Sequence, residues 1–453
     1  MRLAYVSPLP PARSGIADSS AALLPALGAL AEVTVYPEAG AGDEARPAGV
    51  AALRPLASLP EDLVAGRVER VVYQLGNSAA HHAATYRLLL ELPGLVVLHE
   101  YLLHHLVRDL TLGAGEPGRF AAELAYAGGA EGAWAARTLR EHRVAIDPWR
   151  FPLFERVVDR SLGVAVHSAS TRRRILASRP AARVATLPMP CRVPEVPAAA
   201  AAALRRELGI PEGAPVFATF GLITPHKHLE PALAAFARLR RERPEAVFLV
   251  AGEVSPYYDL AARLAGEAGE GVHLLGRVDL DRFHTLMAAT DVAVNLRHPA
   301  GGETSATLMR LLGLGRAVVV SDSGSFAELP EGTVAKVQVD PSEEEILLAL
   351  FRRLAADPAL RAGMGEAARR HVRRLHAPEV AAQHLVEIVR ELPAGLAPVP
   401  ARGVPSPLAQ GLAAAAVDLG LGEAPELLAA LAAELVALDL DHDLGADAAG
   451  GGP

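Results

Sequence analysis

The residues with the clearest chemical potential lie in the segment GGETSATLMRLLGLGRAVVVSD, where Glu303 follows two glycines. Thr304 and Ser305 come next, and their hydroxyls can accept hydrogen bonds from the first N–H groups of a helix. The glycines allow a ligand to approach the backbone closely. Glu303 and Arg310 are seven residues apart, which predicts that they share one helix face. A ligand-binding loop and a helix cap with a surface ion pair both fit this pattern.

A second candidate is Lys227 in the segment FGLITPHKH. It follows Gly221 at the end of a predicted strand and precedes a helix predicted to begin near Leu229. A cation at such a junction is well placed to neutralise a phosphate group. The sequence has one other lysine, Lys336, and otherwise uses arginine. Lys227 is therefore either a phosphate ligand or an ordinary surface lysine.

Histidines gather in the segment LVVLHEYLLHH, which invites comparison with zinc proteases. His99 and His104 are five residues apart, about 140° around an α-helix, whereas the zincin motif needs two histidines four residues apart. We therefore expect no metal site. We expect His99 to point into a cleft, and His104 and His105 to be structural.

The loop RSGIAD opens a predicted helix near the N-terminus. Ser14 and Gly15 permit close approach of an anion to the helix N-terminus, although Ser14 or Asp18 could simply cap the helix. Neither this loop nor FGLITPHK contains the G-x-G-x-x-G pattern, which argues against a nicotinamide or flavin site.

These residues need a scaffold that brings them together, and the chain offers one. Short β-branched runs alternate with longer helical stretches, which is typical of α/β folds with parallel sheets. Ligands of such sheets bind beyond the carboxyl ends of the strands, where the residues above lie. A Pro- and Ala-rich passage at 188–203 separates two series of strands. The first series is Arg2–Val6, Val33–Tyr36, Arg70–Gln74, Leu95–Leu98, Gly163–Val166 and Val184–Leu187, and the second is Val216–Thr219, Ala246–Val250, Val272–Leu275, Asp291–Asn295, Ala317–Val320 and Val334–Val339.

Composition limits the class of protein. The 453 residues are 51% hydrophobic and 21% charged, which fits a globular protein of two or three domains and excludes a disordered one. The single cysteine, Cys191, excludes a disulfide framework. A net charge of −8 argues against a nucleic-acid partner. Neither a signal peptide nor an apolar run of about 18 residues is found, so we expect a cytoplasmic protein.

We therefore predict an α/β protein with two Rossmann-like, doubly wound parallel-sheet domains that face a cleft. Residues 1–190 form the first domain and residues 191–392 the second, whose last helix, predicted over Pro378–Leu392, returns to the first. Residues 393–453 form a Pro-rich linker and an acidic tail that is partly helical over Leu408–Leu440.

Eight motifs carry a family resemblance: PLPPARSGIADSS, QLGNSAAHH, LVVLHEYLLHH, GVAVHS, TFGLITPHK, LLGRVD, RHPAGGETS and GRAVVVSDSGSFAEL. In this order they resemble glycosyltransferases of the GT-B fold, specifically the large family 4 of retaining, nucleotide-sugar-dependent enzymes. The resemblance covers about residues 1–392. It implies transfer of a sugar, without metal or other cofactor, from a nucleoside-diphosphate sugar to an acceptor hydroxyl in glycan, glycolipid or polysaccharide synthesis.

The resemblance also implies residue roles. Gly15 corresponds to a glycine whose amide faces the donor diphosphate, and Lys227 to the diphosphate-binding lysine. His99 corresponds to the histidine near the donor sugar, and Glu303 to the first carboxylate of the Glu-x7-Glu signature, which binds sugar hydroxyls. The predicted set is catalytic His99, Glu303 and Lys227; donor-binding Ser14, Gly15, Gly221, Lys227, Arg277, Val278, Gly302, Glu303, Thr304, Ser305 and Arg310; and, on the acceptor side, Asn77, His81, Glu100 and His167.

Two positions depart from the family pattern. Leu222 stands where the family commonly has an arginine, and Arg310 replaces the second glutamate, which often binds ribose. We hypothesise that Arg310 restores the positive charge missing at Leu222, with Glu328 as a substitute ribose ligand.

Other interpretations stay open. The chain could be a nucleotide-sugar epimerase or phosphorylase of the same fold, or a non-catalytic nucleotide-sugar-binding module. A basic cluster in the helix predicted after His167 and Ser168 is either a solvated face or a peripheral membrane contact. The cluster comprises Arg172, Arg173, Arg174, Arg179 and Arg183.

Overall fold

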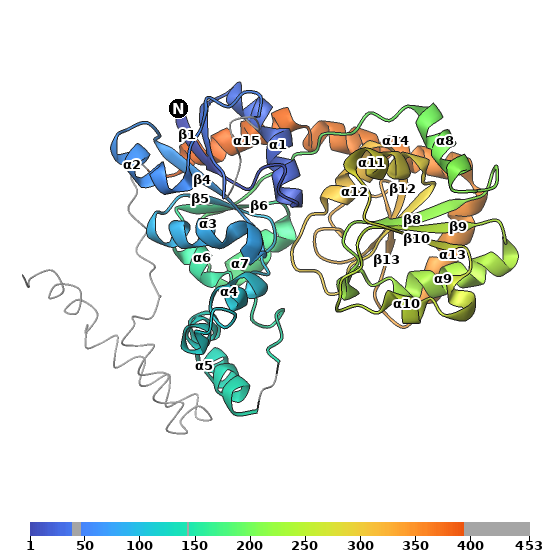
Figure 1. Ribbon diagram of the computed structural model, residues 1–453, viewed down its shortest axis with the longest axis horizontal. Coiled ribbons are helices and arrows are strands. Elements are labelled where there is room, and N and C mark those ends of the chain that lie inside the picture. Colours follow the sequence, from blue (N-terminus) through green and yellow to red (C-terminus); the bar gives the residue numbers. More distant parts are fainter. Residues whose placement is uncertain (39–46, 143–144, 394–453) are drawn as a thin grey trace, which may run out of the picture.

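The computed structural model describes residues 1–38, 47–142 and 145–393, which form two α/β domains, each built on a parallel sheet (Figure 1). The first sheet has seven strands in the order β3-β2-β1-β4-β5-β6-β7, and the second has six in the order β10-β9-β8-β11-β12-β13. The strands of the first sheet are β1 Arg2–Val6, β2 Glu32–Tyr36, β3 Ala52–Leu53, β4 Arg70–Leu75, β5 Leu95–Leu98, β6 Gly163–Val166 and β7 Val184–Thr186. Those of the second are β8 Val216–Phe220, β9 Val247–Ala251, β10 Val272–Gly276, β11 Val292–Asn295, β12 Ala317–Ser321 and β13 Ala335–Val337.

The central strands read as continuous apolar runs because both faces of each sheet are covered by helices. Every residue of β5, β6, β11 and β12 is buried, and valine dominates these strands. Parallel sheets of α/β proteins have this pattern, since crossover helices pack on both faces.

The helices complete two layered domains. On the first sheet, α1 and α15 share one apolar core, and the opposite face packs against a core built by α3 to α7. In the second domain α8, α11, α12 and α14 cover one face, and α9 and α13 the other. The helix bounds are α1 Gly15–Gly28, α2 Leu59–Val64, α3 Ala79–Glu91, α4 His104–Leu110, α5 Pro117–His142, α6 Glu155–Asp159, α7 Ala169–Ser178, α8 Ala198–Glu207, α9 Glu230–Glu242, α10 Leu260–Arg263, α11 Leu280–Ala289, α12 Ala306–Gly313, α13 Glu343–Ala356, α14 Pro358–Leu375 and α15 Pro378–Glu391, with short 3-10 turns at Leu56–Ser58, Pro225–Lys227 and Gly266–Gly269.

The sequence predictions of fold class and strand positions are confirmed. Every predicted strand is present, with bounds that differ by at most two residues. Sequence analysis missed β3, which has only two residues, both half-buried, and is therefore too short to give a strand pattern. The predicted tail helices lie outside the described residues. None of the described helices is long and apolar enough to cross a bilayer.

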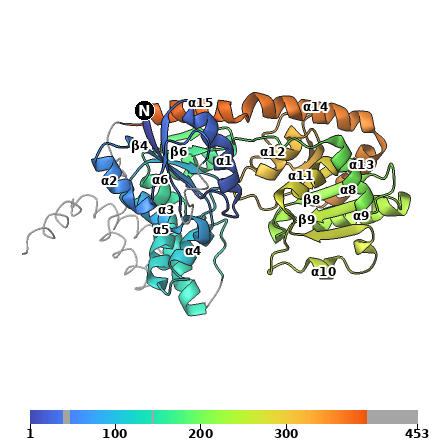
Figure 2. The ribbon, with the colours of Figure 1, turned by 45° about the horizontal axis from the view of Figure 1, so that its top comes forward.

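Two chain crossings connect the domains. Figure 2 shows α14 and α15 running in succession from the second domain onto the first, where α15 packs beside α1. The chain also crosses between β7 and α8, and the two crossings are tied together: the Cys191 N–H donates to the His376 carbonyl (2.7 Å), and His376 Nδ1 lies 2.9 Å from the Met189 carbonyl. The carboxyl ends of both sheets are thereby held facing one another.

Candidate active site between the domains

Lys227 lies at the carboxyl edge of the second sheet, in the 3-10 turn that follows β8. It is buried, and its Nζ donates a hydrogen bond to the carbonyl oxygen of Phe220. Burial lowers the pKa of Lys227 well below its ordinary value, and the nearby Arg297 lowers it further. Gly221 has φ +86°, and a Cβ there would lie 3.7 Å from both Lys227 Nζ and Thr307 Oγ1. The lysine and the first turn of α12 therefore flank the same glycine. Lys227 precedes α9, which begins at Glu230, close to the predicted start near Leu229.

Glu303 lies in the loop between β11 and α12. Its Oε2 accepts from the Gly301 N–H at 2.7 Å, and its Oε1 is 3.4 Å from Nε of Arg297. α12 begins only at Ala306, with Ser305 as N-cap accepting from Leu308 N–H. The prediction that Glu303 and Arg310 share a helix face is wrong, because Glu303 precedes the cap.

Arg310 instead reaches the first domain. Its Nη2 lies 3.1 Å from Oδ2 of Asp18 on α1, and the two side chains are 17% and 34% exposed. Thr304, one residue after Glu303, has a buried hydroxyl with no partner among the described residues.

His99, at the end of β5, belongs to a chain of side-chain hydrogen bonds in the first domain. His167 Nδ1 lies 2.9 Å from the Leu187 carbonyl oxygen, to which it donates, and His167 Nε2 lies 3.2 Å from His99 Nδ1. His99 Nε2 lies 2.7 Å from Oε1 of Gln74, whose Nε2 is buried without a partner among the described residues. Burial lowers the pKa values of both histidines, that of His167 to about 4, so both rings are neutral.

Glu100 follows His99 and faces the second domain. Its Oε1 accepts from the Asn77 N–H (3.2 Å), and Asn77 Oδ1 accepts from the Leu106 N–H (3.0 Å). Burial, with a further contribution from the Glu303 carboxylate, raises the pKa of Glu100 to about 8. Two carboxyl groups from different domains therefore lie within electrostatic reach, and one of them is protonated at neutral pH.

The two glycines before Glu303 make room for the first domain. The Tyr101 and Leu102 N–H groups both donate to the Gly301 carbonyl (3.1 and 3.3 Å). Gly302 has φ +85°, and a Cβ there would lie 2.3 Å from a Tyr101 ring carbon. In this structure the glycines allow close contact between domains, whereas the sequence suggested close approach of a ligand.

The other predicted residues occupy varied positions. Ser14 caps α1 through the Ile16 N–H, while a Cβ at Gly15 would meet no atom within 4 Å. Arg277 is exposed after β10, with Val278 half-buried beside it. His81 is half-buried on α3. His104 is buried with its Nδ1 against the Phe151 carbonyl, which agrees with a structural role.

Glu328 is occupied by the first domain. Its carboxylate accepts from the Ala169 and Ser170 N–H groups at the start of α7, at 2.9 Å for Ala169. A carboxylate at a helix N-terminus is favourable because the first N–H groups lack partners and the dipole is positive there. Ribose binding by Glu328 would have to compete with this contact.

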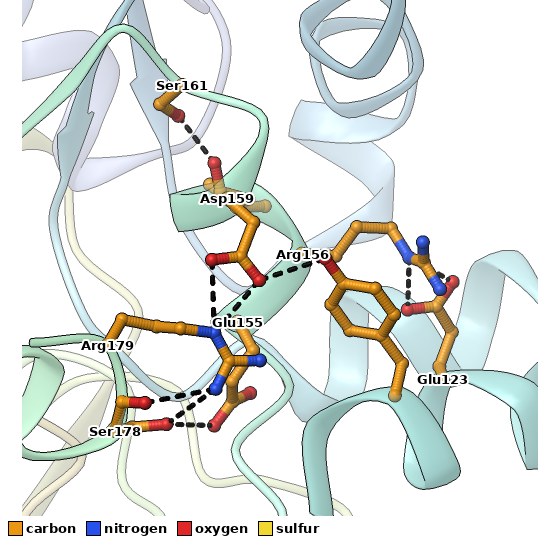
Figure 3. A network of polar contacts seen from close by, with 9 residues as sticks. Glu123, Glu155, Arg156, Asp159, Ser161, Ser178 and Arg179 are labelled. Atoms are coloured by element: carbon orange, nitrogen blue, oxygen red, sulfur yellow. Dashed lines mark hydrogen bonds and ion pairs between the residues drawn. The ribbon is translucent and has the colours of Figure 1, made fainter. Parts of the chain in front are cut away.

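The basic cluster is mostly exposed, at Arg172, Arg173, Arg174 and Arg183, and α7 ends at Ser178, before Arg179 and Arg183. Arg179 Nε contacts both oxygens of Asp159 (2.9 and 3.0 Å), which also accepts from the Tyr126 hydroxyl (Figure 3). Of the other members, Arg172 donates to the Val184 carbonyl, Arg173 lies 3.8 Å from Glu328, and Arg174 stands over the Tyr101 ring.

A cavity of about 320 Å³ lies on the side of α12 away from Lys227, next to the two chain crossings between the domains. Thr304 and Leu308 line it, whereas Thr307 faces Lys227. His167 and Glu328 belong to its wall as well. Among the residues that the structure describes, no three His, Cys, Asp or Glu side chains gather as a metal ion would require.

Sequence reasoning missed three residues of this site: Gln74, Asp18 as a partner of Arg310, and Arg297. Arg297 follows β11 at the same sheet edge as Lys227, and that position was a signal available in the sequence.

Comparisons with known proteins agree with this architecture. Residues 201–371 match the family model for glycosyl transferases group 1. A GDP-mannose-dependent monoacylated alpha-(1-6)-phosphatidylinositol monomannoside mannosyltransferase from Corynebacterium glutamicum is 30% identical over 196 residues, 42% of this chain and 51% of that protein. The match therefore spans about half the length of this curated relative.

Solved structures match over a larger part of the chain. HepE from Anabaena in complex with UDP superposes with a TM-score of 0.59 and 13% identity, over 86% of this chain and all of that one. Sucrose-phosphate synthase from Thermosynechococcus elongatus gives a TM-score of 0.59 and 19% identity, over 86% and 99%. The predicted GT-B fold is confirmed, and together these comparisons support a glycosyltransferase of that fold.

Proposed function

We propose that this protein transfers a sugar from a nucleoside-diphosphate sugar to an acceptor hydroxyl, as a retaining, metal-independent enzyme of glycosyltransferase family 4. The observation that carries the proposal is the placement of Lys227 and the first turn of α12 around Gly221, with Glu303 of the same domain within electrostatic reach of Glu100 of the other. This arrangement offers a cation and free helix N–H groups to a diphosphate. Glu303 would bind hydroxyls of the donor sugar beside it.

The chemistry required is departure of the nucleoside diphosphate from the anomeric carbon. Negative charge grows on the leaving phosphate, and groups already aimed at it lower the barrier. Lys227 and the amides near Ser305 would serve this purpose, with Ser14 and Gly15 on the opposite side. Closure of the two domains would exclude water and limit hydrolysis of the donor.

The hydrogen bonds of His99 and the protonation of Glu100, both in the first domain, indicate which group receives the acceptor proton. Both nitrogens of His99 are engaged by His167 and Gln74, and Glu100 already holds a proton at neutral pH. Neither group is therefore a ready base. We propose that the leaving phosphate accepts the proton, so that attack occurs on the face it leaves and the configuration is retained.

Binding is the first test. UDP, GDP, ADP and dTDP are added to the metal-free protein at 100 times the expected dissociation constant, where a ligand raises the free energy of unfolding by about 2.7 kcal/mol. We expect one nucleotide to raise Tm in the wild type and in Lys336→Ala, but not in Lys227→Ala. Lys336 is a suitable control because it is the other lysine and its Nζ donates to the Ala327 carbonyl, away from the site.

Turnover is the second test. GDP-mannose and UDP-glucose are offered separately with lipid-linked and soluble acceptors, because the curated relative's name contains GDP-mannose and HepE was solved with UDP. Release of nucleoside diphosphate that depends on the acceptor, with a product of retained anomeric configuration by NMR, would support the proposal. Nucleotide binding without release from either donor would favour the non-catalytic binding module. An altered sugar released without an acceptor would favour an epimerase.

A further inference from the structure

The donor side of the cleft needs a second cation that the phosphate loop does not supply. Leu222 follows Gly221 and is 57% exposed, so an apolar side chain stands beside the predicted diphosphate site. Lys227 is the other candidate on this loop, and burial opposes its charge. A diphosphate carries more negative charge than one lysine can balance.

Arg297 lies beside this site and is held in place from several sides. Its N–H donates to Ser321 Oγ (3.0 Å), and its Nη1 donates to the Leu296 carbonyl (2.7 Å). Its Nε faces Glu303, and the side chain is 14% exposed. Nη2 has no hydrogen-bond partner among the described residues. The guanidinium is thus held in a fixed orientation, and its Nη2 donors are not used by these contacts.

The charges around Arg297 leave room for an anion. Arg297 and Lys227 are close enough for the arginine to lower the pKa of the lysine, and Glu303 is the carboxylate beside both. Arginine presents several donors in a planar fork that suits phosphate oxygens. Buried cations of this kind are stabilised by an ionic partner, and Glu303 balances only one of the two.

Arg310 is the competing candidate, and its geometry is less suitable. Its Nη2 is directed at Asp18 of α1, so its charge is already paired across the domain interface. Binding a diphosphate through Arg310 would require this ion pair to break.

We propose that Arg297, together with Lys227, binds the donor diphosphate and replaces the cation absent at Leu222. The inference rests on the proposed function, since it names the group that contacts the same donor. Arg297 would donate from Nη2 to a phosphate oxygen while Nε keeps Glu303 oriented toward the sugar.

The test compares dissociation constants of a nucleoside and its diphosphate, using whichever of the four nucleotides stabilises the wild type. We expect Arg297→Gln to weaken diphosphate binding about 10–100-fold, as expected for a lost charge-assisted hydrogen bond. Nucleoside binding should stay within about twofold, because the base and ribose do not contact this residue. Arg297→Lys should recover part of the loss, whereas Arg310→Gln should change the nucleoside and diphosphate constants by the same small factor, because it removes only the ion pair with Asp18 across the domains. Equal loss for nucleoside and diphosphate would overturn the proposal, as would a selective loss in Arg310→Gln alone.

Removing Arg297 leaves Glu303 without its partner and could harm folding, so a second pair of variants is needed. Arg297→Gln in a Glu303→Gln background removes both charges, and is compared with Glu303→Gln alone. A diphosphate-selective loss between these two variants supports the proposal, and no difference overturns it.

Inorganic pyrophosphate separates this inference from the proposed function. If no nucleotide stabilises the wild type but pyrophosphate does, and Arg297→Gln abolishes that effect, the anion site stands and the nucleotide-sugar function fails. If pyrophosphate stabilises the wild type and Arg297→Gln equally, the role of Arg297 is overturned whatever the nucleotides do. If neither pyrophosphate nor any nucleotide binds, both proposals fail.

Discussion

The two sides of the interdomain cleft differ in the charge of their side chains. On the first domain, His99, His167 and Glu100 are all uncharged at neutral pH, because burial disfavours their ionised forms. On the second domain, Arg297 and Glu303 form an ion pair beside Lys227. The difference agrees with the proposal that the second domain binds the donor diphosphate. The first offers neutral polar groups, which suits a side that positions hydroxyls without attracting charge.

The largest expected effect on turnover comes from removing a basic side chain from the second domain. Lys227→Ala should lower kcat/KM for the donor about 10²–10³-fold, since it removes a group aimed at the charge that develops on the leaving phosphate. Nucleotide-release assays on Lys227→Ala, Lys336→Ala and the wild type measure this effect. Turnover of Lys227→Ala within about threefold of wild type would show that the leaving group departs elsewhere.

The contact between the two sides can be broken at Gly302. Gly302→Ala combines a positive φ with a Cβ only 2.3 Å from Tyr101, whose hydroxyl is fixed by the Ala300 carbonyl (3.1 Å). We expect a loss of about 2–4 kcal/mol in the free energy of unfolding, the sum of backbone strain and overpacking. Gly332→Ala is the matched control, because Gly332 has φ +78° and open space around it. It should lose only the strain, about 1 kcal/mol.

Chemical denaturation of both glycine variants measures the difference. Equal losses would mean that Tyr101 moves aside without cost and that the domain contact is not tightly packed.

Much of this comparison was predictable, and the reason is topological. His99, Lys227 and Glu303 each follow a buried valine-rich or aromatic strand by a few residues, and parallel strands bring such positions to one edge. The strands were readable because residues such as those of β5 are apolar without interruption.

What could not be predicted depends on partners far apart in sequence. Arg310 meets Asp18 across 292 positions, so its direction was invisible to any local pattern. Gly302 faces Tyr101 of the other domain. The segment offers several residues that could cap α12, and the structure uses Ser305, which follows Glu303. The sequence analysis considered Arg310 and not Arg297, because the burial of Arg297 beside Glu303 depends on tertiary packing.

Titration of Glu100 tests whether the first-domain side of the cleft is uncharged at neutral pH. Its pKa is raised to about 8 in the folded protein, against about 4.3 in an unfolded chain. The folded state therefore binds the proton more tightly, and this contribution to stability is complete below about pH 4 and lost as pH rises to about 8. Glu100→Gln resembles the protonated form at every pH. We expect the wild type to lose stability relative to this variant between about pH 4 and 8, and the difference to be constant above that.

Unfolding free energies of both proteins from pH 5 to 9 measure this difference. In the same range, the turnover of the wild type should fall above about pH 8, where ionised Glu100 adds a negative charge beside Glu303, and Glu100→Gln should not share that fall. Parallel stability curves throughout would show that Glu100 is ionised, and the cleft would then have charge on both sides.

The smallest expected effect comes from removing the contact of Glu328 with the first N–H groups of α7, which joins the two domains. Glu328→Ala removes the carboxylate that accepts from the Ala169 and Ser170 N–H groups, and loss of such a helix cap costs about 1 kcal/mol. The cost falls on the closed arrangement of the domains, so small-angle scattering should show a modest increase in the radius of gyration. Glu331→Ala is the control, because Glu331 lies in the same loop with its side chain 93% exposed.

Nucleoside affinity then decides what Glu328 contacts. If Glu328 only joins the domains, Glu328→Ala should change the dissociation constants of nucleoside and diphosphate by the same small factor, since both report the cost of closure. A loss confined to ligands that carry ribose, with pyrophosphate binding unchanged, would instead identify Glu328 as the ribose ligand. That result would mean that the α7 contact is released when the donor binds, and that the interface opens to admit the nucleotide.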